Sequence, residues 1–333
     1  MSMVTNKRIA YFDLLKLFAV LLVIVGHVIS QYDDRGYGHP INVWIYSFHM
    51  PLFMFMSGLF FQNTLKKPFK EMVRSKSILL LLPLVSWSII NLIVNNLAVL
   101  PVSEWNKAVW QYLTSFGPLH GLWYLKCLFL YLVVCYLAVK FLRNEYLASA
   151  STVVLFLLLP NVNFSSQMIV FFWTGFFYNK ISNAWPDAKG TQWLVLGGGG
   201  GIMMSFILLF LWKPDYSYLN GSKSFLEYIL FVMMGVSSSI FWVTAFRWWF
   251  HDRETRWIRL CSNMGACSLG IYCSQEYFYS PNLWGRILTP YGNTAFYIFW
   301  SITILIICYS LVLVLQKYTY TSLFFLGIRR LKK

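Results

Sequence analysis

Residues 7–30 read KRIAYFDLLKLFAVLLVIVGHVIS, and this stretch decides the fold. It is almost long enough to cross a bilayer as a helix, yet its apolar run contains Asp13, Lys16 and His27. A helix turns about 100° per residue, so Lys16 and His27 point within about 20° of each other and lie about 16 Å apart along the axis. Asp13 precedes Lys16 by three residues, which makes the two neighbours. Because ionisable groups are costly in hydrocarbon, this polar stripe must face protein or water.

The composition places the chain among polytopic membrane proteins. Of its 333 residues, 58% are hydrophobic and only 12% are charged, whereas a soluble domain carries about 25% charged residues. The net charge of +15 would also suit a protein that binds nucleic acid. The Lys and Arg residues, however, lie in short blocks between apolar runs, as in the cytoplasmic loops of membrane proteins. We therefore expect a lipid bilayer, and no nucleic acid, around the chain.

Apolar runs predict an all-α integral membrane protein with about ten transmembrane helices. Most of the 27 Lys and Arg residues fall on one side if the N-terminus is cytoplasmic, so both termini are expected in the cytoplasm. Residues 1–333 are expected to form a single transmembrane domain with no appended soluble domain. The long outer connection at about 98–120 is expected at the membrane interface. The expected helices are 9–30, 42–62, 77–99, 121–141, 146–161, 165–181, 192–212, 224–246, 262–280 and 295–316.

Familiar soluble-enzyme motifs do not occur in the sequence. The six cysteines lie in or beside apolar runs and are interpreted as packing residues, and no CxxC metal spacing is present. There is no Walker loop, Rossmann glycine pattern, HExxH or GxSxG. The glycine run at 197–201 lacks the Lys-Ser/Thr of a phosphate loop and indicates close helix packing or a kink. We therefore predict no metal site and no nucleotide or serine hydrolase chemistry.

Further polar and aromatic side chains are expected toward the outer ends of the helices. Five of the six candidates have an ordinary alternative. His49 also fits a hydrogen-bonded or interfacial histidine, and Trp123 and Tyr124 also fit an aromatic belt. Lys126 also fits a snorkelling lysine, and Glu276 a structural pairing with Lys126 or a histidine. The candidates are His49, Ser57, Trp123, Tyr124, Lys126 and Glu276.

A neutral histidine at the end of a polar stripe suits general-base catalysis on a hydroxyl group. Asp13 is about 21 Å from His27 along the helix, too far to orient that ring. Lys16 is better placed to meet an anionic group that enters from the cytoplasm. A donor with phosphates on the inner side and a reactive end at His27 would match the length of the stripe.

At these residues the chain resembles the membrane acyltransferase-3 family, the bacterial integral-membrane enzymes that O-acylate sugars. The resemblance covers nearly the whole chain and is supported by LWYLKCLF at 122–129 and SLGIY at 268–272. The resemblance rests mainly on two motifs. The first is the opening R-x4-D-x2-K-x10-H, formed by Arg8, Asp13, Lys16 and His27, and the second is FHMPLFMFMSG at Phe48–Gly58.

The resemblance implies acyl-CoA, usually acetyl-CoA, as a cytoplasmic co-substrate, with no tightly bound cofactor. The acceptor would be a carbohydrate hydroxyl, on a surface polysaccharide or other glycan, outside the bacterial inner membrane. Lys16 stands where the family commonly has Arg, which keeps the charge but loses bidentate phosphate geometry. Arg74 and Lys76 stand where relatives tend to carry an arginine pair, and Gln275 where they often have histidine. Any partner protein would be a separate chain.

Three groups of site residues are therefore expected. The catalytic group is His27 as the base, Lys16, and Asp13 to orient Lys16 or Arg8. The acyl-CoA-binding group is Lys16, Arg8, Arg74 and Lys76. The acceptor side is His49, Ser57, Trp123, Tyr124, Lys126 and Glu276. The alternative function is a transporter or flippase of a small anionic or sugar-linked substrate; the concentration of charges in the first helix counts modestly against it.

Overall fold

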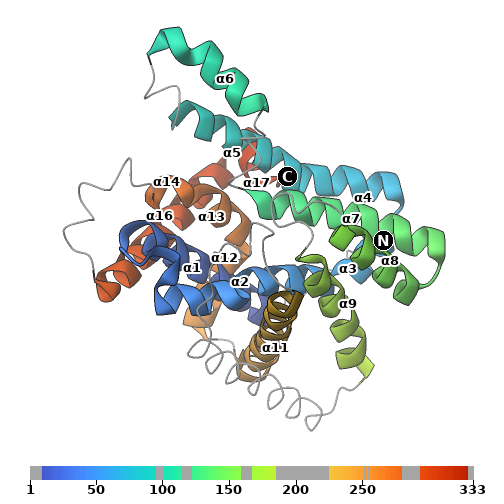
Figure 1. Cartoon of the computed structure of the whole chain (residues 1–333). Coiled ribbons are helices and arrows are strands. Elements are labelled where there is room, and N and C mark those ends of the chain that lie inside the picture. The colour runs from blue at the N-terminus through green and yellow to red at the C-terminus, as the bar shows by residue number, and fades with distance from the viewer. Residues whose placement is uncertain are drawn as a thin grey trace.

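The computed structural model describes residues 10–94, 101–114, 122–158, 167–184, 225–250, 253, 255–279 and 293–328. Every regular element in these ranges is a helix, as expected (Figure 1). Among them, five helical segments are long and apolar enough to cross a membrane: Ala10–Tyr32, Phe69–Leu92, Trp123–Leu142, Tyr228–Phe250 and Thr294–Lys317. The count of ten and the cytoplasmic termini stay predictions. The expected helix at 192–212, the glycine run within it and Arg8 lie outside the described residues.

Helix α1 (Ala10–Tyr32) has neighbours on several sides. Leu15 and Ile24 are fully buried, and even the carboxylate-bearing Asp13 is only 6% exposed. The polar stripe of α1 is thus enclosed largely by protein. The helices that pack against α1 include α2 (Pro40–Leu59), α11 (Phe225–Phe250), α12 (Arg256–Ala266), α13 (Ser268–Ser274) and α16 (Thr294–Lys317).

Two glycines bring α2 and α9 (Ile169–Ala184) into close backbone contact. A Cβ atom added at Gly58 would overlap the carbonyl oxygen of Phe172, and one added at Gly175 would overlap that of Phe55. Small residues allow membrane helices to approach this closely. Since α11 also packs against α2, the second helix is held firmly beside α1.

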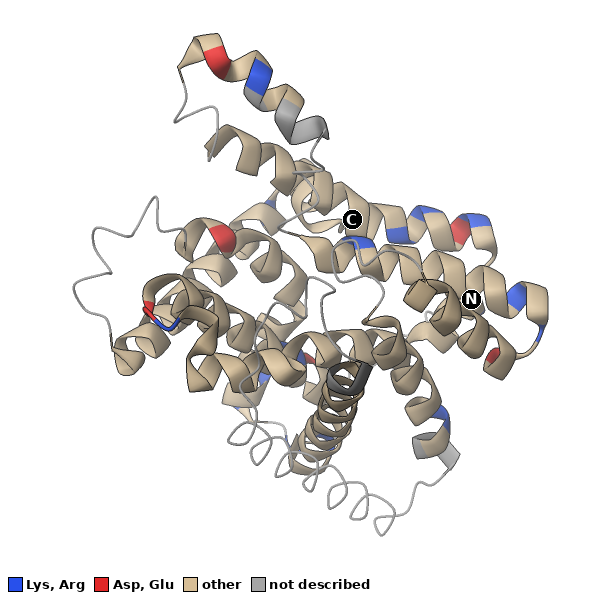
Figure 2. Cartoon of the chain, viewed as in Figure 1, with Lys and Arg blue, Asp and Glu red and all other residues tan. Residues whose placement is uncertain are grey.

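A second group of helices begins with α4 (Phe69–Lys76), which continues through a π-helical turn, η2 (Ser77–Leu81), into α5 (Leu82–Leu92). This segment therefore starts eight residues before the expected 77. Charged residues are sparse over the bundle as a whole, and α4 carries a group of them (Figure 2). The remaining members are α7 (Trp123–Leu142), α8 (Glu145–Leu158) and α17 (Thr319–Leu326), while η4 (Val102–Glu104) and α6 (Trp105–Thr114) lie in the long connection.

The helix expected at 262–280 is broken into three parts. It begins earlier, at α12, where the Thr255 hydroxyl accepts a hydrogen bond from the Ile258 N–H at 3.2 Å and caps the helix. It stops at Cys267, whose N–H bonds to the Met264 carbonyl instead of the carbonyl four residues back. A second interruption at Gln275 separates α13 from α14 (Glu276–Tyr279). The single-helix prediction was wrong because the charged face of α12 hid its start and apolarity alone does not reveal a break.

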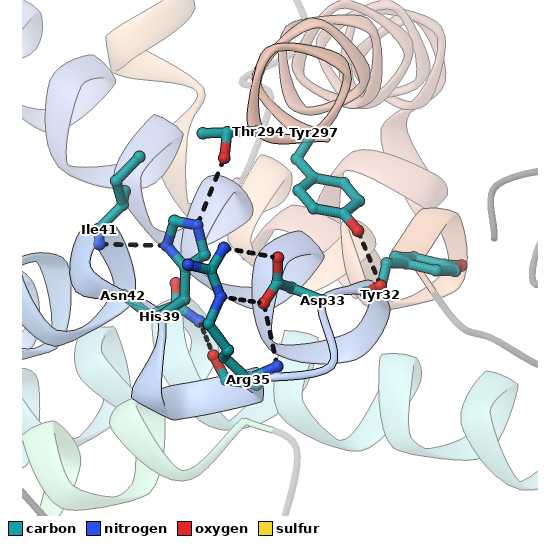
Figure 3. Close-up of polar contacts among 9 residues, drawn as sticks. Tyr32, Asp33, Arg35, His39, Ile41, Asn42, Thr294 and Tyr297 are labelled. Carbon is teal, nitrogen blue, oxygen red and sulfur yellow. Dashed lines mark hydrogen bonds and ion pairs between the residues drawn. The ribbon is translucent and has the colours of Figure 1, made fainter. Parts of the chain in front are cut away.

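A polar cluster joins the α1–α2 turn to the start of α16 (Figure 3). His39 Nδ1 accepts a hydrogen bond from the Ile41 N–H at 3.2 Å and so caps α2, while its Nε2 lies 3.3 Å from the Thr294 hydroxyl. The Tyr297 hydroxyl donates to the Tyr32 carbonyl at 2.8 Å. These contacts fix the end of α1 nearest to His27.

The stability of this cluster should depend on the charge of His39. Burial, with a smaller contribution from Arg35, lowers the pKa of His39 below its ordinary value. The unfolded chain then binds more protons than the folded chain, so stability falls as the pH drops below about 6.5. We expect His39→Asn, which keeps a good capping residue, to lose part of this dependence. Melting temperatures of the wild type and of His39→Asn in detergent between about pH 5 and 8 test this expectation. Equal slopes of melting temperature against pH for the two proteins would contradict it.

Candidate functional site: two levels along the first helix

The lower level of the site is an ion pair on α1. Lys16 Nζ lies 3.0 Å from Asp13 Oδ1, and the side chains are 34% and 8% exposed, respectively. A Cβ atom at Gly265 of α12 would overlap the Asp13 carbonyl oxygen, so glycine lets α12 press against α1 here. The pair thus neutralises a charge that would otherwise be buried alone.

Lys16 borders a cavity of about 250 Å³ that is lined by residues of α1, α2, η2, α7, α12 and α13. The polar members of its wall are Lys16, Ser57, Tyr124, Ser268 and Tyr272, and most of the wall is apolar. The apolar members are Met50, Phe53, Met56, Phe60, Leu79, Leu80, Leu128, Ala266 and Leu269. Such a space suits a mostly apolar ligand with a few hydrogen-bonding groups.

Ser57 and Tyr124 form a hydroxyl pair in the wall of this cavity. Ser57 Oγ lies 2.9 Å from Tyr124 Oη, and both approach the Phe53 carbonyl oxygen, at 2.9 and 3.3 Å. Ser57 lies about 26 Å along α2 from Pro40, and Lys16 lies about 24 Å along α1 from Tyr32. Ser57 and Tyr124, which were expected on the acceptor side, therefore lie at the depth of Lys16.

The π-helical turn η2 supplies another part of the wall through Leu79 and Leu80. Such turns are rare and often occur at functional sites. The preceding helix α4 carries Arg74, which is exposed, and Lys76, which is half-buried. These two expected donor-binding cations thus precede the cavity wall by a few residues in the sequence but are not among the described residues that line the cavity.

The upper level of the site surrounds His27. Its Nδ1 lies 3.3 Å from the Tyr46 hydroxyl, and its ring stacks on Tyr279 of α14 with centroids 4.9 Å apart and planes 17° apart. The imidazole is half-buried. His27 is not among the described residues that line the cavity, which therefore reaches Lys16 but does not by itself reach the imidazole.

Tyr46 also links His27 to His49. The Tyr46 and His49 rings lie 4.8 Å apart, and His49 Nδ1 donates to the Ile45 carbonyl at 2.8 Å. Because a carbonyl only accepts, this bond fixes the His49 proton on Nδ1. The two histidines expected at similar depth are thus joined through one tyrosine.

The remaining acceptor-side candidates are more dispersed. Glu276 accepts a hydrogen bond from Asn91 Nδ2 at 3.1 Å. No ion pair joins it to Lys126, although the structure describes both residues. Lys126 is half-buried, and Trp123 is partly buried against the core. Of the alternatives open for Glu276, the pairing with Lys126 is thus not formed; α5 packs against α13 and supplies the Asn91 amide as the partner.

Several residues of the site were not anticipated from the sequence. Tyr46 and Tyr279 contact His27, and Tyr272 packs its ring 5.9 Å from Tyr124. In the sequence these tyrosines resemble ordinary interfacial aromatics. Only the position of Tyr46, three residues before His49 in an otherwise apolar helix, distinguishes it.

Comparisons with known proteins identify the family. A family model described as an acyltransferase domain matches residues 9–315. Nodulation protein NolL of Mesorhizobium japonicum is 39% identical over 88 residues, 25% of this chain and 24% of the relative. NolL of Sinorhizobium fredii is 37% identical over 87 residues, with the same shares. The chain thus matches about a quarter of the length of these relatives, and no solved structure matches it significantly. Because the family model covers most of the chain, the protein belongs to the acyltransferase-3 family.

Proposed function

We propose that this protein is an O-acyltransferase of the bacterial inner membrane. It moves an acyl group, with acetyl the first expectation, from cytoplasmic acyl-CoA to a hydroxyl of a cell-envelope carbohydrate. One observation carries the proposal beyond family membership: a single continuous helix holds Lys16 at a cavity and His27 about 16 Å farther along. A donor bound at one level can thereby present its reactive end to a base at the other.

The cavity fits the uncharged arm of acyl-CoA better than its phosphates. Asp13 already neutralises Lys16, and most of the cavity wall is apolar. Transferring phosphates into such surroundings would be costly. We therefore assign Lys16 and the hydroxyl pair of Ser57 and Tyr124 to the amide groups of the donor arm, whose thioester end would extend toward His27. The phosphates would meet Arg8, Arg74 and Lys76 at the cytoplasmic mouth.

The reaction would proceed by general-base catalysis. His27 Nε2 takes the proton of the acceptor hydroxyl as its oxygen attacks the thioester carbonyl carbon. The carbon–sulfur bond breaks, and the CoA thiolate takes the proton back from His27. The products are an ester of the carbohydrate and free CoA. His49, Trp123, Lys126 and Glu276 would shape the acceptor end.

Mass spectrometry of cell-surface glycans from a gene-deletion strain tests this function. We expect loss of the mass increment of one acyl group, restored by the wild-type gene. The increment itself would identify the acyl group and the glycan that carries it. Unchanged glycans, together with lost uptake or efflux of a small anionic or sugar-linked compound, would instead support the transporter.

A further inference from the structure

The histidine at the upper level has two ring nitrogens, and only one can serve as the base. Its Nδ1 lies 3.3 Å from the Tyr46 hydroxyl, a group that can either donate or accept a hydrogen bond. The direction of this bond decides which nitrogen carries the proton in the neutral ring. His49, by contrast, contacts a carbonyl and has no such choice.

Packing holds the Tyr46 ring and the imidazole in their relative positions. A Cβ atom at Gly26 would lie 2.9 Å from Tyr46 Cε2, so the absence of a side chain at residue 26 lets the Tyr46 ring reach α1 beside His27. Tyr279 stacks on the imidazole, and Tyr37 packs against the Tyr46 ring with centroids 5.3 Å apart. An imidazole held between aromatic rings is restricted in rotation, so its two nitrogens keep distinct surroundings.

We propose that Tyr46 is a positioning residue whose hydroxyl oxygen accepts the Nδ1–H of His27 and thereby leaves the Nε2 lone pair free as the catalytic base. This inference rests on the proposed acyl transfer. If Tyr46 instead donated its proton to Nδ1, the hydrogen of the neutral ring would sit on Nε2. The ring would then have no lone pair for the acceptor hydroxyl.

The same bond would persist through the reaction. When Nε2 takes the proton of the acceptor hydroxyl, both nitrogens of the imidazolium carry hydrogen. The Tyr46 oxygen still accepts from Nδ1–H and faces the positive charge. When Nε2 returns its proton to the CoA thiolate, the ring is left in the tautomer in which it began. Tyr46 would thus hold the His27 imidazole in one orientation without exchanging a proton itself.

The direct test is the nitrogen-15 NMR spectrum of histidine-labelled protein in lipid nanodiscs. The chain has five histidines, and the His27 signals are identified by their loss in His27→Gln. We expect wild-type His27 to carry its proton on Nδ1 and Tyr46→Phe to shift the population toward Nε2–H. A wild-type ring protonated on Nε2 would overturn the proposal whether or not transfer activity is found.

Kinetics supply the second readout. Tyr46→Phe keeps the ring and should lower kcat about 10- to 100-fold, part of the roughly 10²–10⁴-fold that a general base contributes, with KM for acetyl-CoA nearly unchanged. Tyr37→Phe is the matched control, since it removes a phenol hydroxyl from the neighbouring ring, and it should stay near wild type. Unchanged kcat in Tyr46→Phe would overturn the proposal, whereas an inactive wild type with the expected tautomer would overturn only the proposed function.

A double-mutant cycle separates the hydroxyl from general packing. Gly26→Ala should push the Tyr46 ring away from α1 and lower kcat while leaving the hydroxyl in place. If both changes act through the same hydrogen bond, adding Gly26→Ala to Tyr46→Phe should cost little more, because coupled residues are not additive. Fully additive losses would show that the two changes act independently and would contradict their action through one hydrogen bond.

Discussion

Replacing His27 with glutamine should lower acyl transfer by about 10²–10⁴-fold, the contribution typical of a general base. Glutamine keeps a polar side chain at this half-buried position but has no nitrogen that takes up a proton near neutral pH. The measurement is incorporation of labelled acetyl from acetyl-CoA into envelope glycans by membranes that contain equal amounts of each protein.

His39→Asn is the control for this substitution. His39 caps α2 in the turn and lies outside the proposed catalytic site, so its replacement should leave the transfer rate close to wild type at neutral pH. Transfer by His27→Gln within about two-fold of wild type would remove general-base catalysis by His27 from the mechanism.

Replacing Lys16 with methionine should affect both stability and transfer. The change leaves the buried Asp13 carboxylate without its cation, and breaking a buried ion pair costs about 3–5 kcal/mol. Lys16 is 34% exposed, which favours the lower end of this range. We expect a lower melting temperature in detergent together with greatly reduced transfer.

The double variant Asp13→Leu/Lys16→Met distinguishes structure from function. Replacing both members of a buried pair with apolar residues is often neutral or stabilising, so the melting temperature should recover. Transfer should stay low if the Lys16 ammonium contacts the donor. Recovery of transfer with stability would reduce Lys16 to a structural role. Lys67→Met, which breaks the exposed Lys67–Glu71 pair, should cost less than about 1 kcal/mol and serves as the control.

The long helices could be predicted from the sequence because length and apolarity are local properties. The expected 9–30 and 295–316 differ from α1 and α16 by only one or two residues at each end. The helix at 262–280 was harder, because its interruption at Cys267 depends on one changed backbone hydrogen bond. A composition-based prediction contains no information about that bond.

The same contrast applies to the site. The contact of Asp13 with Lys16 follows from their spacing on one helix. The contact of Ser57 with Tyr124, which are 67 residues apart in the sequence, does not. Tyr124 lies in the first turn of α7, which suggested a position near the outer surface, yet this helix starts beside the far end of α2. Only the packing of distant helices places its hydroxyl beside that of Ser57.

The π-helical turn at Ser77–Leu81 has a consequence for the evolution of the family. Such a turn accommodates one residue more than an α-helical turn, so a single-codon deletion there would let α4 and α5 continue as one regular helix. Both flanking helices could keep their packing partners, while Leu79 and Leu80 would be re-aimed. Insertion or loss of one amino acid at this turn would thus let descendants of one ancestor reshape the cavity that Lys16 borders without rebuilding the bundle.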